Sequence, residues 1–262
     1  MPIHPHNYLI PIGEEEILWR YIDLPKLTSL LRDRCLFFCR ADKFSDPFEC
    51  STPKREYQYR EVVAFGRSQQ DTIRAKQQVE EMSNFFQRAK RATVVNSWHI
   101  NTNESDAMWR LYLKTSEGVA IQSNISRIKE ALQETPELLY SSKVRYINYE
   151  TDIYHHPIDY PVTGLNTITP VIHKRIEFSH EAEFRIFYDI TDAVSDINGI
   201  YWESQPNPLG RYFIVNPNLL IDKIVFAPTA DNYCKEKIKK IVKEAGYVFQ
   251  FKESTLSNIP LY

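Results

Sequence analysis

The sequence predicts a single α+β domain with mixed, mostly antiparallel sheets, flanking helices and a helical insertion near residues 54–91. Three observations support this prediction. Short apolar segments of strand length recur along the chain and alternate with segments of helical spacing. The 262 residues are 43% hydrophobic, which is enough for a substantial core. No internal repeat or low-complexity linker divides the chain, so we expect an extended arm over residues 1–16 and one domain over 17–262.

The individual elements follow from these local patterns. ILWRYI (17–22) is a short apolar segment that predicts a strand. LPKLTSLLRDR (24–34) predicts a helix, because its leucines recur at helical spacing and Pro25 suits the first helical turn. The tyrosine- and proline-rich stretch 151–170 is expected to be a loop. Further strands are expected at 35–41, 92–100, 118–124, 142–150, 181–190, 207–215, 220–228 and 247–254. Further helices are expected at 103–113, 125–134 and 232–246, with the end of another at 171–178.

Residues 54–91 are highly charged and rich in glutamine. This segment predicts an amphipathic helix or a pair of helices with one wet side. The basic clusters at 54–55 and 88–91 are interpreted as a solvated helix face rather than as a nucleic-acid patch. The apolar residues that recur there at 3.6-type spacing are Ile73, Val79, Met82, Phe86 and Ala89.

Composition narrows the class of protein. The formal charge is −2, from 32 Lys+Arg against 34 Asp+Glu, so no global field attracts nucleic acid. The first residues lack the pattern of a signal peptide, and no apolar run reaches the ~20 residues of a membrane-spanning helix. We therefore expect a cytoplasmic protein with reduced thiols that does not interact with a membrane.

Motifs for common cofactor chemistries are missing. The chain has only 7 glycines and contains no Walker A, G-x-G-x-x-G or G-x-S-x-G sequence. Cys35, Cys39 and Cys50 are spaced more widely than the knuckles of a zinc site, and the first two fall in a predicted strand. No metal site is therefore expected.

The stretch KFSDPFEC (43–50) places two carboxylates and an aromatic residue directly after a predicted strand. Asp46 is expected to cap backbone amides of the turn, which Pro47 stiffens. Phe48 is expected to insert into the core and anchor the turn. Glu49 follows the turn, so turn chemistry does not explain it, and we expect it to pair with Arg20 or Arg185.

A charged face is predicted on the strand that contains EAEFRI (181–186). Glu181, Glu183 and Arg185 recur at period two, so they point to one side of the strand. Two interpretations are open. The face is either solvated, with Glu–Arg pairing along it, or it lines a cleft in which a carboxylate stabilises developing positive charge.

Arginine and aromatic residues occur together elsewhere in the chain. Arg20 shares one face of its predicted strand with Leu18 and Ile22, which indicates either an edge residue or a buried anion binder. Trp98, Trp109 and Tyr112 lie in the stretch 97–112, where aromatic residues either fill the core or form the wall of a pocket for a flat ring.

The stretch LWRYIDLPKLTSLLRDRCLFFCRADKFSDPFEC (18–50) resembles the opening of a prokaryotic domain-of-unknown-function family, number 2971. NSWHINTNESDAMWRLYLKTSEGVAI (96–121) and FSHEAEFRI (178–186) are similar to later blocks of that family, and the resemblance extends over nearly the whole chain after residue 16. Ser45 stands where the family has Asn. Its hydroxyl still suits a turn, but an amide contact to a ligand would be lost.

The order of these blocks also resembles, more distantly, ADP-ribosyltransferase-like folds. That resemblance implies small sheets that form a cleft, with NAD bound there as a substrate. It implies catalytic roles for Arg20, which anchors a ribose or phosphate, and for Glu183, which stabilises an oxocarbenium-like transition state. The residues implied to bind NAD beside Arg20 are Tyr21, Ser97, Trp98, Trp109 and Tyr112. The residues expected to support the site are Asp46, Glu49, Glu181, which orients the acceptor, and Arg185, which holds a carboxylate in place.

Three functions remain open at this point. An enzyme would transfer ADP-ribose from NAD or hydrolyse NAD, with a toxin or phage-defence role, and its macromolecular acceptor is open. A non-catalytic module would bind a small ligand or a partner chain through Arg20, Arg185 and the turn carboxylates. A nuclease would gather carboxylates around Mg²⁺, although no lysine completes the usual signature. The carboxylates of that nuclease site would be Asp46, Glu49, Glu181 and Glu183.

Overall fold

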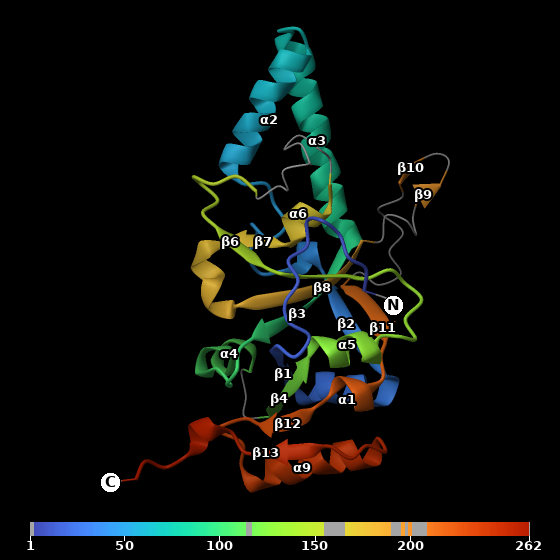
Figure 1. Ribbon diagram of the computed structural model, residues 1–262, viewed down its shortest axis with the longest axis vertical. Coiled ribbons are helices and arrows are strands. Elements are labelled where there is room, and N and C mark those ends of the chain that lie inside the picture. The colour runs from blue at the N-terminus through green and yellow to red at the C-terminus, as the bar shows by residue number, and fades with distance from the viewer. Residues whose placement is uncertain are drawn as a thin grey trace.

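The computed structural model describes residues 3–113, 117–154, 166–189, 195–196, 199–200 and 209–261. Within these residues a nine-stranded sheet forms the centre of the molecule (Figure 1). Its neighbouring strands are antiparallel except for β12 and β13, which confirms the mixed, mostly antiparallel sheet predicted from the sequence. The strands of this sheet are β1 (Ile17–Asp23), β2 (Cys35–Arg40), β3 (Thr93–Ile100), β4 (Gly118–Asn124), β5 (Tyr140–Lys143), β8 (Glu183–Asp189), β11 (Gly210–Ile214), β12 (Lys223–Phe226) and β13 (Gln250–Lys252).

Strand β3 is the branch point of the sheet. One of its edges pairs with β8 along its length, from Thr93 to His99. The other edge pairs with β2 only at Val94 and Val95, and with β1 only at His99 and Ile100. Strands β1 and β2 therefore part between these two short pairings, and the sheet splits into two arms, β2–β11 and β1–β4–β12–β13.

One face of the sheet is covered by helices α1, α5, α8 and α9, whose apolar residues join those of the strands in the main core. Local sequence sets where these helices begin. The carboxylates of Asp23 and Asp231 accept hydrogen bonds from the backbone amides of Lys26 and Cys234, which caps α1 and α9. These helices are α1 (Leu24–Asp33), α5 (Ile125–Ala131), α8 (Pro217–Leu220) and α9 (Asn232–Glu244).

Most of the remaining elements are short, and several of them contribute residues to the cleft described below. Strands β6 and β7 form a small parallel sheet of their own, and η2 leads from β7 to β8. Strands β9 and β10 pair with each other. The remaining short elements are η1 (Ala41–Lys43), α4 (Asp106–Tyr112), β6 (Arg145–Ile147), α6 (Ile168–Val171), β7 (His173–Arg175), η2 (Ile176–Glu181), β9 (Ser195–Asp196), β10 (Gly199–Ile200) and η3 (Thr255–Ser257).

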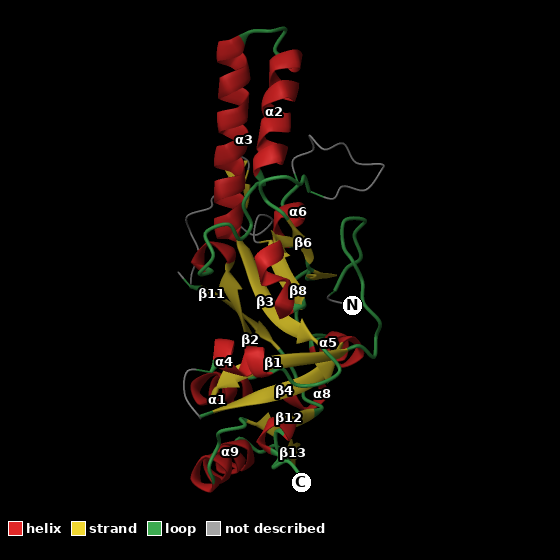
Figure 2. Ribbon diagram, turned by 90° about the vertical axis from the view of Figure 1, so that its left-hand side faces the viewer, coloured by secondary structure: helices red, strands yellow, loops and turns green. Residues whose placement is uncertain are grey.

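The helical insertion is a hairpin of two helices, α2 (Lys54–Arg67) and α3 (Thr72–Ala92), that projects away from the sheet (Figure 2). This confirms the amphipathic pair predicted for the segment. Asp71 caps α3 by accepting hydrogen bonds from the amides of Ile73 and Arg74. Within the described ranges, no helix combines the length and the apolar character needed to cross a bilayer.

Several predicted elements differ from the structure, among them the expected loop over 151–170, whose last residues begin helix α6. The segment 171–178 was predicted to end a helix, but it forms β7 and η2, because residues 173–175 satisfy their backbone by pairing with β6. The segment 142–150 divides between β5 and β6 rather than forming one strand. Residues 155–165 of the expected loop and 207–208 of an expected strand lie outside the described residues.

Candidate functional site

A cleft of about 490 Å³ opens where β1 and β2 part beside β3. Strand β8, helix α4 and the turn after η1 also contribute to its walls. The structure thus brings together residues that are far apart in the chain, including all but one of the predicted site residues. Those that line the cleft are Arg20, Tyr21, Asp46, Glu49, Ser97, Trp98, Tyr112, Glu181, Glu183 and Arg185.

Trp109 is the exception, because it does not line the cleft. Its indole nitrogen donates a hydrogen bond of 2.8 Å to a carboxylate oxygen of Glu104. Its ring packs edge-on against Tyr21, with 4.9 Å between the ring centroids. Trp109 therefore supports the cleft wall at Tyr21 instead of forming the wall itself.

A buried cluster of charges forms the floor of the cleft. The Nζ atom of Lys174 lies 2.9 Å from Glu49, 2.7 Å from Glu181 and 3.3 Å from Glu183. Arg185 donates a hydrogen bond of 2.9 Å to each carboxylate oxygen of Glu183 and one of 2.8 Å to Glu49. Two cations thus hold three carboxylates, which leaves the cluster with one formal negative charge.

The burial of this cluster excludes the solvated-face interpretation of the charged strand. Glu183 is 4% exposed and Arg185 is 0% exposed. Glu181 also faces the cluster, although it does so from the end of η2 and not from the strand. Ala182 adopts a left-handed backbone with φ of 39°, which separates the two elements. The expected pairing of Glu49 with Arg185 is present.

The carboxylates of the cluster differ in pKa. Burial raises the pKa of Glu183, but the charges of Arg185 and Lys174 and side-chain hydrogen bonds from Arg185 and Ser97 outweigh it, so the pKa falls to about 2. Burial also raises the pKa of Glu181, and Lys174 only partly opposes this effect, so that pKa stays above its ordinary value. Burial lowers the pKa of Lys174, but the surrounding carboxylates more than reverse the effect.

Arg20 lies at the split of the sheet. Its Nη1 atom donates a hydrogen bond of 2.6 Å to the carbonyl oxygen of Ser97, and its guanidinium lies 5.8 Å from the centroid of the Trp98 ring. Among the described residues it has no carboxylate partner. Burial lowers its pKa to about 10, with a small opposing effect from Tyr112. It therefore remains a cation at neutral pH, without a counter-ion from the described chain.

The turn after η1 forms a wall of the cleft. Asp46 accepts a hydrogen bond of 3.1 Å from the amide of Phe48, which is the turn contact expected from the sequence. Asp46 also accepts hydrogen bonds of 3.1 and 2.8 Å from Nε and Nη2 of Arg175. The expectation that Phe48 fills the core is wrong. Phe48 is 44% exposed, and the guanidinium of Arg175 lies 4.5 Å from its ring centroid.

Lys174 and Arg175 were missed by sequence reasoning. Both lie in VIHKRIEF (171–178), which was assigned to a helix. As a strand, the same segment sends neighbouring residues to opposite sides, so that Lys174 reaches the buried cluster while Arg175 reaches the turn at Asp46. The signal in the sequence is the run of polar residues HKR (173–175) between two isoleucines, which is compatible with a short strand.

The alternative of a Mg²⁺-dependent nuclease can be compared with the donors of this site. In the part of the chain that the structure describes, no group of three or more His, Cys, Asp or Glu side chains is arranged to hold a metal ion. The carboxylates assigned to a nuclease are engaged by Lys174, Arg175 and Arg185. This donor set favours side-chain cations over Mg²⁺ at these oxygens.

Residues 108–186 match the model of a family described as "Protein of unknown function (DUF2971)". The resemblance to that family is confirmed over this segment. The matched segment contains Tyr112, Lys174 and Glu183, whereas the similar stretch at 18–50 lies outside the match. The match therefore covers less of the chain than the sequence blocks suggested.

Comparisons of whole chains give weaker likenesses. The structure of Thermus sp. 2.9 DarT in complex with carba-NAD+ is 11% identical, with a TM-score of 0.36, over 94% of this chain and 98% of that chain. The structure of Thermus sp. 2.9 DarT in complex with ADP-ribosylated ssDNA is 10% identical, with a TM-score of 0.37, over 95% of this chain and 98% of that chain. No curated protein matches the sequence.

Proposed function

We propose that the cleft binds NAD and that the protein transfers ADP-ribose from NAD to an acceptor or to water. The proposal rests on one observation. The two charged groups of the cleft meet on β3, because the carbonyl oxygen of Ser97 accepts a hydrogen bond from Arg20 and, two residues further along the strand, His99 pairs with Glu183 of β8. A cation without a carboxylate partner and the ionised Glu183 therefore lie beside the same strand of the cleft, β3.

Arg20 supplies the site for an anionic part of the ligand. The half-buried guanidinium of Arg20 has lost part of its hydration and has only the Ser97 carbonyl and the Trp98 ring in return, so an incoming anion would supply the missing counter-charge. The planar group matches phosphate oxygens, and the hydrogen bonds between such ions are among the strong ones in proteins. The pyrophosphate of NAD has this chemistry. The cleft volume of about 490 Å³ lies within the range of small-molecule sites.

Glu183 supplies the negative charge that the reaction needs. Cleavage breaks the bond between the ribose C1′ and the nicotinamide nitrogen, and the electron pair leaves with neutral nicotinamide. Positive charge then develops on the ribose. A carboxylate held in place before the reaction stabilises that charge without reorganising. With its pKa lowered to about 2, Glu183 is ionised at neutral pH. The acceptor oxygen forms the new bond to C1′ and releases its proton.

Glu181 is proposed to orient the acceptor. One of its oxygens is bonded to Lys174, and its pKa is raised mainly by burial. A carboxylate with a raised pKa accepts a proton more readily than Glu183 does, so the two neighbours divide electrostatic stabilisation and proton transfer between them. Tyr112 lies close enough to both carboxylates for their charges to raise its pKa, in addition to the larger effect of burial, to about 12.

The test is to incubate the purified protein with NAD and measure both free nicotinamide and the melting temperature. We expect NAD to raise the melting temperature, Mg²⁺ to leave it unchanged, and nicotinamide to be released slowly. Absence of both binding and release, with every acceptor offered, would overturn the proposal. Growth arrest on expression in a bacterial host, relieved in Glu183→Gln, would support the toxin or defence role.

A non-catalytic ligand-binding module is the second candidate. The observation that favours it is the complete pairing of Glu183, since Arg185 and Lys174 already engage both of its oxygens. In that case NAD or another nucleotide would raise the melting temperature without any release of nicotinamide. A nuclease would instead cleave RNA or DNA in a Mg²⁺-dependent manner.

A further inference from the structure

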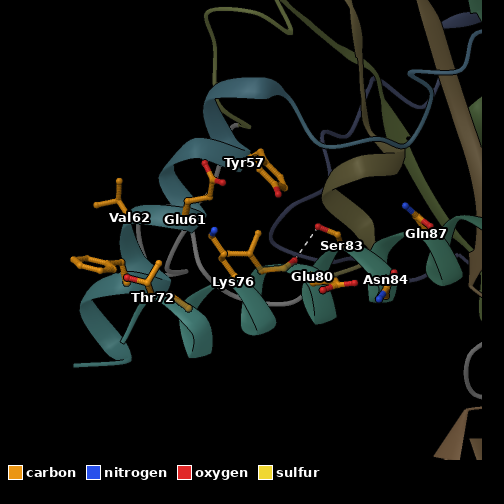
Figure 3. A pocket seen from close by; sticks show the side chains of 12 residues that line it. Tyr57, Glu61, Val62, Thr72, Lys76, Glu80, Ser83, Asn84 and Gln87 are labelled. Carbon is orange, nitrogen blue, oxygen red and sulfur yellow. Dashed lines mark hydrogen bonds between the residues drawn. The ribbon is translucent and has the colours of Figure 1, made fainter. Parts of the chain in front are cut away.

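The α2–α3 hairpin carries a groove of about 800 Å³, remote from the cleft. Figure 3 shows that the groove runs along both helices, with Glu61 and Val62 contributed by α2 and Lys76 and Glu80 by α3. From Thr72 to Gln87 it extends over about 22 Å of helix α3, at 1.5 Å per residue. None of the residues that line it belongs to the cleft.

The groove contains an exposed apolar stripe on α2. Tyr57 is 40% exposed, Phe65 is 43% exposed and Val62 is 70% exposed. On the opposite helix, Ala75 and Val79 form its floor. A two-helix hairpin buries only the stripe between its helices, so a second apolar stripe stays in contact with water unless another element covers it. The hairpin projects away from the sheet (Figure 2), and the apolar stripe on α2 stays exposed.

Three charged side chains line the same groove, Glu61, Lys76 and Glu80. Within the described residues none of them forms an ion pair. An ion pair within the hairpin, between Arg60 and Glu56, is buried. The groove thus presents one lysine and two glutamates to an occupant. Lys76 and Glu80 lie one helical turn apart near the middle of its length.

We propose that this groove is a self-association surface, in which the hairpins of two copies of the chain pack antiparallel to form a four-helix bundle. A two-fold axis at the middle of the groove brings Lys76 of one copy toward Glu80 of the second copy, and the reverse. Lys76 and Glu80 are therefore complementary to the same two residues of an identical partner, whereas Glu61 gains no lysine partner in the groove. Pairing also covers Tyr57, Val62 and Phe65 of both copies at once.

The first test is the mass of the full chain in solution, measured by size-exclusion chromatography with light scattering over a range of concentrations. We expect twice the 30.9 kDa mass of the chain at high concentration. Tyr57→Glu is expected to raise the dimer dissociation constant at least tenfold. Tyr59→Glu is the matched control, because Tyr59 lies on the same helix, is 46% exposed and does not line the groove.

The second test exchanges the charges. Lys76→Glu and Glu80→Lys are each expected to weaken the dimer. In either single variant, residue 76 of each copy faces a residue 80 of the same charge in the other copy. The double variant restores two opposite pairs and is expected to recover the dimer. Glu81→Lys, on an exposed residue outside the groove, is expected to leave it unchanged. All of these positions are exposed, so the melting temperature of the monomer serves as the check on folding.

A chain that stays monomeric at every concentration overturns the proposal, and so does a dimer that tolerates Tyr57→Glu. A double charge exchange that is no better than the single ones overturns the antiparallel pairing. None of these variants touches the cleft. Their outcome is therefore independent of whether NAD is bound or consumed.

Discussion

The guanidinium of Arg20 donates a hydrogen bond of 2.6 Å to the carbonyl oxygen of Ser97, at the point where β1 and β2 part from β3. In a continuous sheet, a neighbouring strand would occupy this carbonyl. The split leaves it free for a side chain, and that side chain brings a positive charge into the cleft. The same topology therefore opens the cavity and provides its cation.

Arg20→Met is expected to weaken NAD binding by about 10- to 100-fold, because it removes a charge-assisted contact worth about 1.5–3 kcal/mol. Stability is expected to stay the same or to rise, since the lost charge has no carboxylate partner among the described residues. Isothermal titration and thermal unfolding measure the two effects.

Arg175→Met is the control for this variant. Its guanidinium is paired with Asp46 and lies over Phe48, so its loss is expected to cost about 2 kcal/mol of stability. If Arg20→Met proved equally destabilising and bound NAD normally, the anion-binding role of Arg20 would be wrong.

Glu183→Gln is expected to lower the rate of nicotinamide release by about 10²-fold or more, because it removes the charge that stabilises the transition state. The variant is expected to fold with reduced stability, since Arg185 and Lys174 lose part of their partner. Release of nicotinamide from NAD and the melting temperature are measured together.

Glu56→Gln separates loss of stability from loss of chemistry. Glu56 is buried in the α2–α3 hairpin and pairs with Arg60, outside the cleft. The control variant is expected to lower the melting temperature without changing the rate of nicotinamide release per folded molecule. A fully active Glu183→Gln would contradict the proposed reaction.

The stability of the protein is expected to fall in acid partly because of Glu183. Its pKa is depressed from 4.5 to about 2, so its contribution is present above about pH 4.5 and is lost as the pH falls toward 2. At 1.36 kcal/mol per unit, this contribution is on the order of 3 kcal/mol. The raised pKa of Glu181 has the opposite sign and offsets part of the loss.

Urea unfolding of the wild type and Glu183→Gln, followed from about pH 6 to about pH 2.5, measures this contribution. The difference in unfolding free energy between the two proteins is expected to shrink as the pH falls. A difference that stays constant over that range would show that the pKa of Glu183 is not depressed.

Lys174→Met is expected to reduce the free energy of unfolding by about 3–5 kcal/mol, because three buried carboxylates would then share only Arg185. Lys174→Arg is expected to recover part of the loss by restoring the positive charge. Urea denaturation at neutral pH measures both variants.

Lys54→Met is the matched control for Lys174. Lys54 also lies 2.7 Å from a glutamate, but its side chain is 61% exposed. Its loss is therefore expected to change the stability by about 1 kcal/mol or less. Equal effects of the two lysine variants would contradict a stabilising role for the buried cluster.

Local sequence patterns predicted most of the elements because those patterns depend on near neighbours. The strand at 118–124 has the predicted bounds, and the helix predicted at 24–34 forms as α1 behind its Asp23 cap. The patterns failed at 171–178, where pairing with β6, remote in sequence, decides the backbone. They failed again at Phe48, where the interaction with Arg175 holds an aromatic ring at the surface.

Sequence alone determined the α+β class, the helical insertion, the turn contact of Asp46 and the common side of Glu183 and Arg185, because each follows from spacing along the chain. Tertiary structure decided that this side is buried and that Lys174 joins it. It also decided that Trp109 supports the cleft from behind and that Arg20 meets Ser97. These relationships depend on the point along β3 at which its pairing changes from β2 to β1, and the spacing of residues along the chain does not predict that point.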